Sequence, residues 1–441
     1  MKNNNIETTK LLERIDTKVF FMIVGLMLFS MYFPYNHNIA IVYQVMALIL
    51  GVWCCKKNSC GIAFVLILNV TREYIAISTM DSFSAYYSLN SSVMIIYILL
   101  LVGIKLYQKK GIIKFDMAQM LLVALGIQMF MSEFGVMNSD EYNTYFPVVC
   151  CIYILGTLMV EEKSSNFTVK IAFLLSGLFM AIGIIPYYIS HSSIQELTAL
   201  INENGLLVDR NYQSLFLMLC ILNSVVLLIE YAQEINIFFK TGIVAIIVAD
   251  IFIIVVGASR SAILGLIMAI ILYIVLNVKS ISRNIIFLGA ICILFIFAYN
   301  TGLLEPILKR FAQGDVSSGN GRFTLWTQYL ANFKQGNLVQ VIFGRGLIGK
   351  SIVGAPAHNL FVSILFSFGV LGETIFLLYC VCIIIKVLKL CKLELIIIIP
   401  ILFMCCTLEP YYRIEFALYI ACIPAMLVKK EKRENERTKY I

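Results

Sequence analysis

The sequence predicts an all-α, polytopic integral membrane protein. Of its 441 residues, 60% are hydrophobic and only 14% are charged, whereas soluble domains carry about 25% charged residues. Apolar stretches of roughly 20 residues, the length that spans a bilayer as a helix, follow one another along the chain. Short polar breaks separate them, so we expect no soluble domain between the spans.

The apolar stretches predict about 12 to 14 transmembrane helices. The first two and the last two are each joined by a very short turn. The predicted spans are 18–35, 38–55, 61–79, 91–107, 116–134, 144–160, 168–188, 211–230, 241–258, 261–278, 284–300, 368–388, 394–408 and 412–428.

Lysine and arginine set the expected orientation, because they stay on the cytoplasmic side of short loops. With both termini in the cytoplasm, most of the 34 basic residues, including Lys170, lie in cytoplasmic loops and tails. Most of the remaining basic residues are arginines in external segments. Arginine there suits a phosphate or carboxylate ligand, although a long external loop also tolerates a few basic residues.

Charge and cysteine usage exclude several classes of partner. The net charge of +8 is accounted for by the cytoplasmic loops and tail, so no nucleic-acid partner is expected. The 13 cysteines lie in spans or at their inner edges and show neither a disulfide framework nor zinc-like spacing. We therefore expect no metal site.

The spans and loops predict four regions. Residues 1–300 form an N-terminal bundle, 301–367 a large external loop, 368–428 the C-terminal helices and 429–441 a basic cytoplasmic tail. Within the loop, "EPILKRFAQ" and "RFTLWTQYLANFKQG" have helical spacing of apolar residues, with the turn-rich "GDVSSGNG" between them. Long segments between membrane helices usually carry function.

The loop ends in "APAHNLFVSILFSFGVLGE", which contains His358, one of three histidines. The apolar run from His358 to Ile385 covers about 28 residues, more than a bilayer needs. We expect a short helix over about 358–367, a bend, and a span that begins near "GVLGE"; one long tilted helix is the alternative. His358 and Asn359 would then lie at a helix N-terminus, which attracts anions.

Further polar residues recur where predicted external segments meet the spans. "VDRNYQS" places Asp209, Arg210 and Asn211 at the start of the eighth span, and "GASRSAILG" places Arg260 in a tight turn. Arg260 either snorkels to the headgroups as a surface residue or points into the bundle at headgroup depth. In "SGNGRFTLW", Arg322 precedes an aromatic residue suited to the membrane interface.

Three ionisable residues lie deeper in the predicted bundle. Arg72 and Glu73 are on the third span and Asp250 is on the ninth, so they are expected to face the bundle or a wet cavity. A structural ion pair, for example Arg72 with Asp250, is the favoured interpretation. The chain has no Walker-type loop and no nucleotide-sugar signature, so a cytoplasmic nucleotide donor is not expected.

The order of these motifs resembles a known family. An Asp-x-Asn at a helix start, "SRS" at 259–261, Arg310, "GRFTLW", "FGRGLIG" with Arg345, and "AHNLF" followed by "GVLG" look like the bacterial O-antigen ligase and O-antigen or capsular polysaccharide polymerase superfamily. The resemblance covers about residues 200–390 and implies a GT-C-like helical fold. Residue Arg210 departs from the family pattern, where proline is common.

The resemblance implies a glycosyltransferase that needs no cofactor, nucleotide sugar or metal. Its donor would be an oligosaccharide linked to undecaprenyl diphosphate, at the outer face of the bacterial plasma membrane, with a chain-length regulator and a flippase as pathway partners. The implied catalytic residues are His358, Arg260 and Arg322. The implied diphosphate-binding or glycan-binding residues are Arg210, Asp209, Asn211, Arg310, Arg345 and Asn359.

Elementary chemistry agrees with these roles. A departing lipid diphosphate carries negative charge that arginines stabilise, and a histidine of pKa about 6.5 is a suitable base for a hydroxyl. A polymerase of repeat units is the preferred function, and a ligase that moves a finished glycan is the alternative. A lipid-linked oligosaccharide flippase is a further alternative, although it does not need a large external loop rich in arginine.

Overall fold

The computed structural model describes ten continuous stretches of the chain and part of the segment 289–312. All of the described secondary-structure elements are helices. The described residues are 21–26, 37–54, 67–68, 91–108, 115–134, 146–159, 165–190, 210–277, 321–424 and 427, with 289, 292–293, 296, 298–302 and 304–312. No strand occurs among them, which confirms the predicted all-α class.

The long helices coincide with the predicted spans wherever both are described. Four of them are long and apolar enough to cross a membrane, and shorter apolar helices accompany them. The predicted spans 18–35, 61–79 and 284–300 lie mostly outside the described residues. The long helices are α3 (His37–Cys54), α5 (Ser91–Gln108), α6 (Met117–Phe134), α7 (Phe146–Met159), α8 (Ser165–Ser190), α10 (Arg210–Glu230), α11 (Ile237–Val256), α12 (Arg260–Leu276), α18 (Leu360–Leu390) and α19 (Leu395–Cys405).

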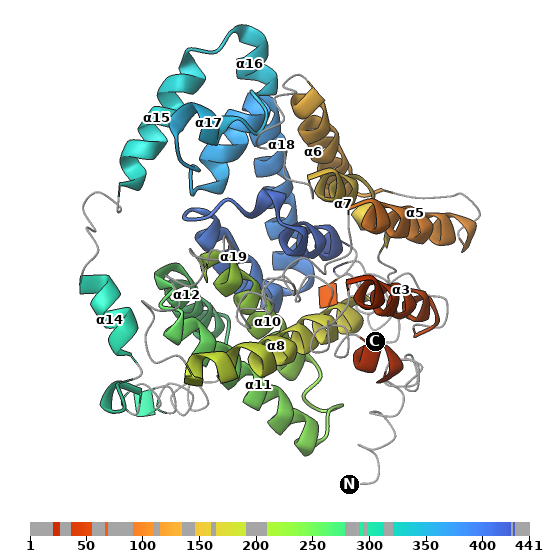
Figure 1. Cartoon of the computed structure of the whole chain (residues 1–441), viewed down its shortest axis with the longest axis vertical. Coiled ribbons are helices and arrows are strands. Elements are labelled where there is room, and N and C mark those ends of the chain that lie inside the picture. Colours follow the sequence, from red (N-terminus) through yellow and green to blue (C-terminus); the bar gives the residue numbers. More distant parts are fainter. Residues whose placement is uncertain are drawn as a thin grey trace.

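The core of the molecule forms around α10. This helix is mainly apolar and packs against α8, α11, α12 and α19 (Figure 1), so nearly all of its side chains are buried, polar ones such as Gln213 and Asn223 included. By contrast, α11 and the second half of α18 leave many large apolar side chains exposed, as expected of helices that face lipid.

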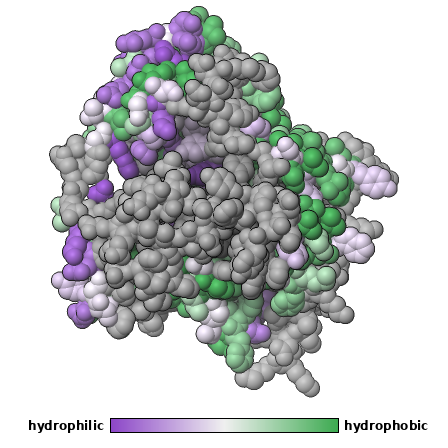
Figure 2. All heavy atoms as spheres, in the orientation of Figure 1, coloured by the Kyte–Doolittle hydropathy of each residue, from purple (hydrophilic) through white to green (hydrophobic). Residues whose placement is uncertain are grey.

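The predicted external loop contributes four short helices. These are α14 (Glu305–Ala312), α15 (Arg322–Lys334), α16 (Leu338–Phe343) and α17 (Gly349–Val353). The first two are the helices that the apolar spacing predicted. Figure 1 places α15, α16 and α17 together at one end of the molecule, beside the start of α18. Figure 2 shows hydrophilic residues gathered over α15 and hydrophobic residues over α6 and α7.

Helix α18 is bent at Gly369, which confirms the predicted break and excludes one continuous helix. Gly369 has φ 71° and ψ −175°, inside an otherwise helical run from Leu360 to Leu390. The loop after α16 fits against this bend: the amide of Arg345 donates to the carbonyl of Phe366 (3.1 Å) and that of Gly346 to Ser367 (2.9 Å). The break therefore leaves carbonyls without helical partners, and the loop after α16 binds them.

Two ionisable residues, Lys170 and Asp250, are buried inside the helix bundle. Lys170 was expected in a cytoplasmic loop, but it lies inside α8 with no exposed surface and contacts Glu394 at 2.7 Å. Asp250 on α11 is buried against Gly177 of α8, and its carboxylate oxygens have no hydrogen-bond partner among the described residues. Arg72 and Glu73 lie outside the described residues, so the Arg72–Asp250 pair stays a prediction.

Candidate functional site

His358 lies in a constrained turn directly before α18. Its backbone φ is 49°, in the left-handed region that non-glycine residues rarely adopt. Asn359 caps the helix, and its Oδ1 accepts from the amides of Phe361 (3.0 Å) and Val362 (3.2 Å). Two of the first amides of α18 are thus already bonded to a side chain, and anion binding at this helix N-terminus stays a prediction.

Helix α15 contacts the turn that contains His358. The Trp326 Nε1 donates to the carbonyl of Ala357 (2.9 Å), and the hydroxyl of Tyr329 donates to the carbonyl of Ala355 (2.9 Å). Arg322 is the first residue of this helix and lies one turn before Trp326, on the same side. The structure therefore brings the helix of Arg322 and the turn of His358 into direct contact.

A loop near the end of the chain also contacts this turn. We name residues 406–413 the Glu409 loop. Glu409 is only 4% exposed, and its Oε2 accepts from Ser363 Oγ at 2.7 Å. Burial raises the pKa of Glu409 to about 7, against the lowering effect of bonds from Ser363 and from the backbone amides of His358 and Ala357.

The Arg260 turn forms a second group of candidate residues. Ser259 Oγ donates to Oδ1 of Asn211 at 3.4 Å, which joins the turn to the start of α10. The guanidinium carbon of Arg260 lies 6.0 Å from the centroid of the Phe311 ring on α14, so this side chain points toward α14. The helix that carries Arg310 therefore packs beside the turn that carries Arg260.

The Glu409 loop also connects these two groups. The hydroxyl groups of Tyr412 and Tyr212 are hydrogen bonded at 2.8 Å, and Tyr212 follows Asn211 on α10. The guanidinium of Arg413 lies 4.5 Å from the centroid of the Tyr212 ring, a distance suited to a cation–π contact. The loop thus contacts both the His358 turn and the helix start beside Arg260.

Arg345 has a different environment from the other candidate arginines. Its guanidinium carbon lies 5.7 Å from the centroid of the Phe366 ring, next to a small apolar cluster around Tyr329, Ala357 and Phe366. Its Nε is buried without a hydrogen-bond partner among the described residues. Asp209 and the side chains of Arg210 and Arg310 lie outside the described part of the chain.

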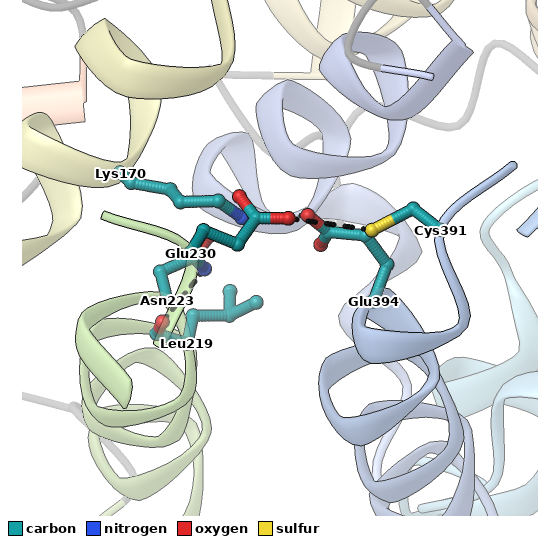
Figure 3. Close-up of polar contacts among 6 residues, drawn as sticks. All are labelled: Lys170, Leu219, Asn223, Glu230, Cys391 and Glu394. Atoms are coloured by element: carbon teal, nitrogen blue, oxygen red, sulfur yellow. Dashed lines mark hydrogen bonds and ion pairs between the residues drawn. The ribbon is translucent and has the colours of Figure 1, made fainter. Parts of the chain in front are cut away.

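One cluster among the described residues has atoms that could ligate a metal. Glu230, Cys391 and Glu394 place one ligand atom each within 4.8 Å of one another, and Cys391 Sγ contacts Glu230 Oε1 at 3.3 Å. Figure 3 shows Lys170 and Glu230 approaching Glu394 and Cys391 from the opposite side. Because the Lys170 ammonium already supplies a cation to Glu394, these residues fit a buried ion pair better than a metal centre.

Sequence reasoning missed the Glu409 loop, although "EPYYR" between the last two spans was a usable signal. Charged and aromatic residues in so short a connection are unusual for a simple turn. Their partners are about 50 and 200 positions away in the chain, and periodicity carries no information on such contacts. The sequence therefore showed an unusual composition in this loop, but it did not show that the loop contacts the candidate site.

The central part of the chain is similar to a known protein family. None of the curated proteins matches it. Residues 243–377 match the family model described as O-antigen ligase, and this segment includes Arg260, Arg322 and His358. That family implies a glycosyltransferase in the broad sense that acts on a lipid-linked glycan in a membrane. Residues 243–377 are therefore similar to the O-antigen ligase family, as the order of the motifs indicated.

Proposed function

We propose that this protein is a polysaccharide polymerase. It joins oligosaccharide repeat units, carried on undecaprenyl diphosphate, into O-antigen, capsule or exopolysaccharide at the outer face of a bacterial plasma membrane. The observation that carries the proposal is the family match over residues 243–377, which contains Arg260, Arg322 and His358 in one segment. A chain-length regulator and a flippase of the same pathway are the proposed partners.

In the proposed reaction, the growing glycan leaves its lipid diphosphate and is joined to a sugar hydroxyl of the next lipid-linked unit. The bond between the donor sugar and the diphosphate breaks as the bond to the acceptor oxygen forms. His358 takes the proton of the acceptor hydroxyl, and Arg260 and Arg322 stabilise the charge on the departing diphosphate. Because arginines supply the positive charge, we propose that the reaction needs neither metal nor nucleotide sugar.

Three variants in the native host test these roles. We expect His358→Asn, Arg260→Ala and Arg322→Ala each to leave single lipid-linked repeat units on the outer face of the membrane. Loss of the base alone is expected to slow transfer on the order of a hundred- to ten-thousandfold. Asparagine is chosen at 358 because it tolerates the left-handed backbone, so the turn is preserved while the base is removed.

Lys334→Ala is the matched control, because this exposed lysine ends the helix that Arg322 begins. We expect normal polymer from that variant, at protein levels equal to those of the native chain. Full-length polymer in all three test variants would contradict the proposal. Long polymer stranded on its lipid would instead support a ligase. A ligase is the second candidate because the family model is described as O-antigen ligase. Repeat units retained on the cytoplasmic face would indicate a flippase.

A further inference from the structure

Glu409 meets the His358 turn through several independent contacts. Its carboxylate accepts from Ser363 Oγ (2.7 Å) and from the backbone amides of His358 and Ala357. A second contact comes from the same loop, where the carbonyl of Cys406 accepts from the Asn359 side chain at 3.2 Å. Apart from the Ser363 hydroxyl, which lies on α18, these contacts involve backbone or capping groups at the turn, so the loop acts on the conformation of the turn.

The aromatic ring of Tyr411 reinforces this attachment. It packs edge-on against Phe368 with ring centroids 5.3 Å apart, at the last residue before the Gly369 bend. The Glu409 loop therefore contacts both ends of the short helix that follows His358. A carboxylate buried there needs its hydrogen bonds, and the turn needs a partner for its amides, so each stabilises the other.

The conformation that Glu409 holds is a strained one. His358 and Ala258 are the only described non-glycine residues with positive φ, and such a backbone costs on the order of 1 kcal/mol or more. Strained residues persist only where surrounding contacts determine them. Two amides of the turn and the Ser363 hydroxyl on α18, all bound by one carboxylate, are such a set of contacts.

We propose that Glu409 is a positioning residue for glycosyl transfer, which holds the His358 turn in its left-handed conformation so that the imidazole meets the acceptor hydroxyl. This inference rests on the proposed role of His358 as the base. Glu409 itself does not touch the reacting atoms. Its ionised form is required, because protonation turns one of its oxygens into a donor and weakens its capacity to accept from the three donors.

The pH dependence of turnover follows from this requirement. Burial raises the pKa of Glu409 to about 7, so protonation below that pH turns one of its oxygens into a donor and weakens the turn. Tyr411 on the same loop and Tyr212 on α10 also face this carboxyl. We expect the native enzyme to lose turnover on the acid side through two ionisations, those of Glu409 and His358.

The test compares Glu409→Gln with His358→Asn and with the double variant, in purified protein supplied with lipid-linked repeat units. We expect Glu409→Gln to lower kcat about ten- to hundredfold, part of the factor that a general base supplies, with KM nearly unchanged. Its acid limb should show one ionisation instead of two. The double variant should be no slower than His358→Asn alone, because Glu409 acts through His358.

Two further variants separate positioning from folding. Glu409→Asp is expected to recover much of the turnover. Glu415→Gln, a change at another buried glutamate on the helix Ile414–Pro424, is expected to keep a native acid limb. Native kcat and a native acid limb in Glu409→Gln, beside an inactive His358→Asn, would overturn this inference alone. A fully active His358→Asn would instead overturn the proposed base, and this inference with it.

Discussion

Lys170→Met is expected to lower the free energy of unfolding by about 3 to 5 kcal/mol, because it leaves an uncompensated charge inside the protein. The Lys170 side chain has no exposed surface, and the Glu394 side chain, 2.7 Å away, is 5% exposed. The pair joins the start of α8 to the turn between α18 and α19. Methionine fills a similar volume, so the expected loss comes mainly from the charge and not from a cavity.

Two comparisons isolate the charge effect in heat unfolding of the purified proteins in one detergent. Lys309→Met removes an exposed lysine that lies 3.5 Å from Glu305, and its expected effect is about 0 to 1 kcal/mol. The double variant Lys170→Met with Glu394→Gln should recover part of the stability lost by the single change. Equal unfolding temperatures for Lys170→Met and Lys309→Met would contradict the expected cost of removing one partner of the buried ion pair.

Gly369→Ala and Gly344→Ala are each expected to destabilise the protein by about 2 to 5 kcal/mol, from overpacking and backbone strain together. A Cβ at Gly369 would overlap the carbonyl oxygen of Ile342, and a Cβ at Gly344 would overlap that of Ser367. Both glycines also have positive φ. Either change separates the loop after α16 from the bend in α18.

Gly354→Ala is the matched control for these two glycines. Gly354 has φ 85°, but a Cβ there would meet open space, so it reports backbone strain of roughly 1 to 2 kcal/mol without overlap. We expect the unfolding midpoints of Gly369→Ala and Gly344→Ala to fall clearly below that of Gly354→Ala. Equal midpoints for all three variants would show that the close backbone approach contributes nothing to stability.

The sequence predicted those features that depend on length and local pattern. The apolar run from His358 to Ile385 is longer than one span needs, and its length predicted the bend that the structure has at Gly369. The spacing in "RFTLWTQYLANFKQG" predicted α15. Side-chain burial was harder, because Lys170 has the local setting of a cytoplasmic loop and only tertiary packing gives it Glu394 as a partner.

The candidate site was predictable by residue type but not by its supporting contacts. Motif order identified His358, Arg260 and Arg322, and the family match covers all three. Asn359 has the pattern of a ligand-binding residue, yet its side chain caps α18 and bonds to Cys406. Glu409 carried no motif, because its role depends on a turn some fifty residues earlier in the chain.

In the proposed reaction, glycosyl transfer uses a lipid diphosphate donor, and His358 is the base. The most direct measurement supplies the purified protein, in lipid nanodiscs, with undecaprenyl-diphosphate-linked repeat units, a metal chelator and no nucleotide sugar. We predict lengthened glycans and release of undecaprenyl diphosphate from the native protein, and neither from His358→Asn. Lengthening that requires a nucleotide sugar or a divalent metal, or that proceeds equally in His358→Asn, would contradict this account.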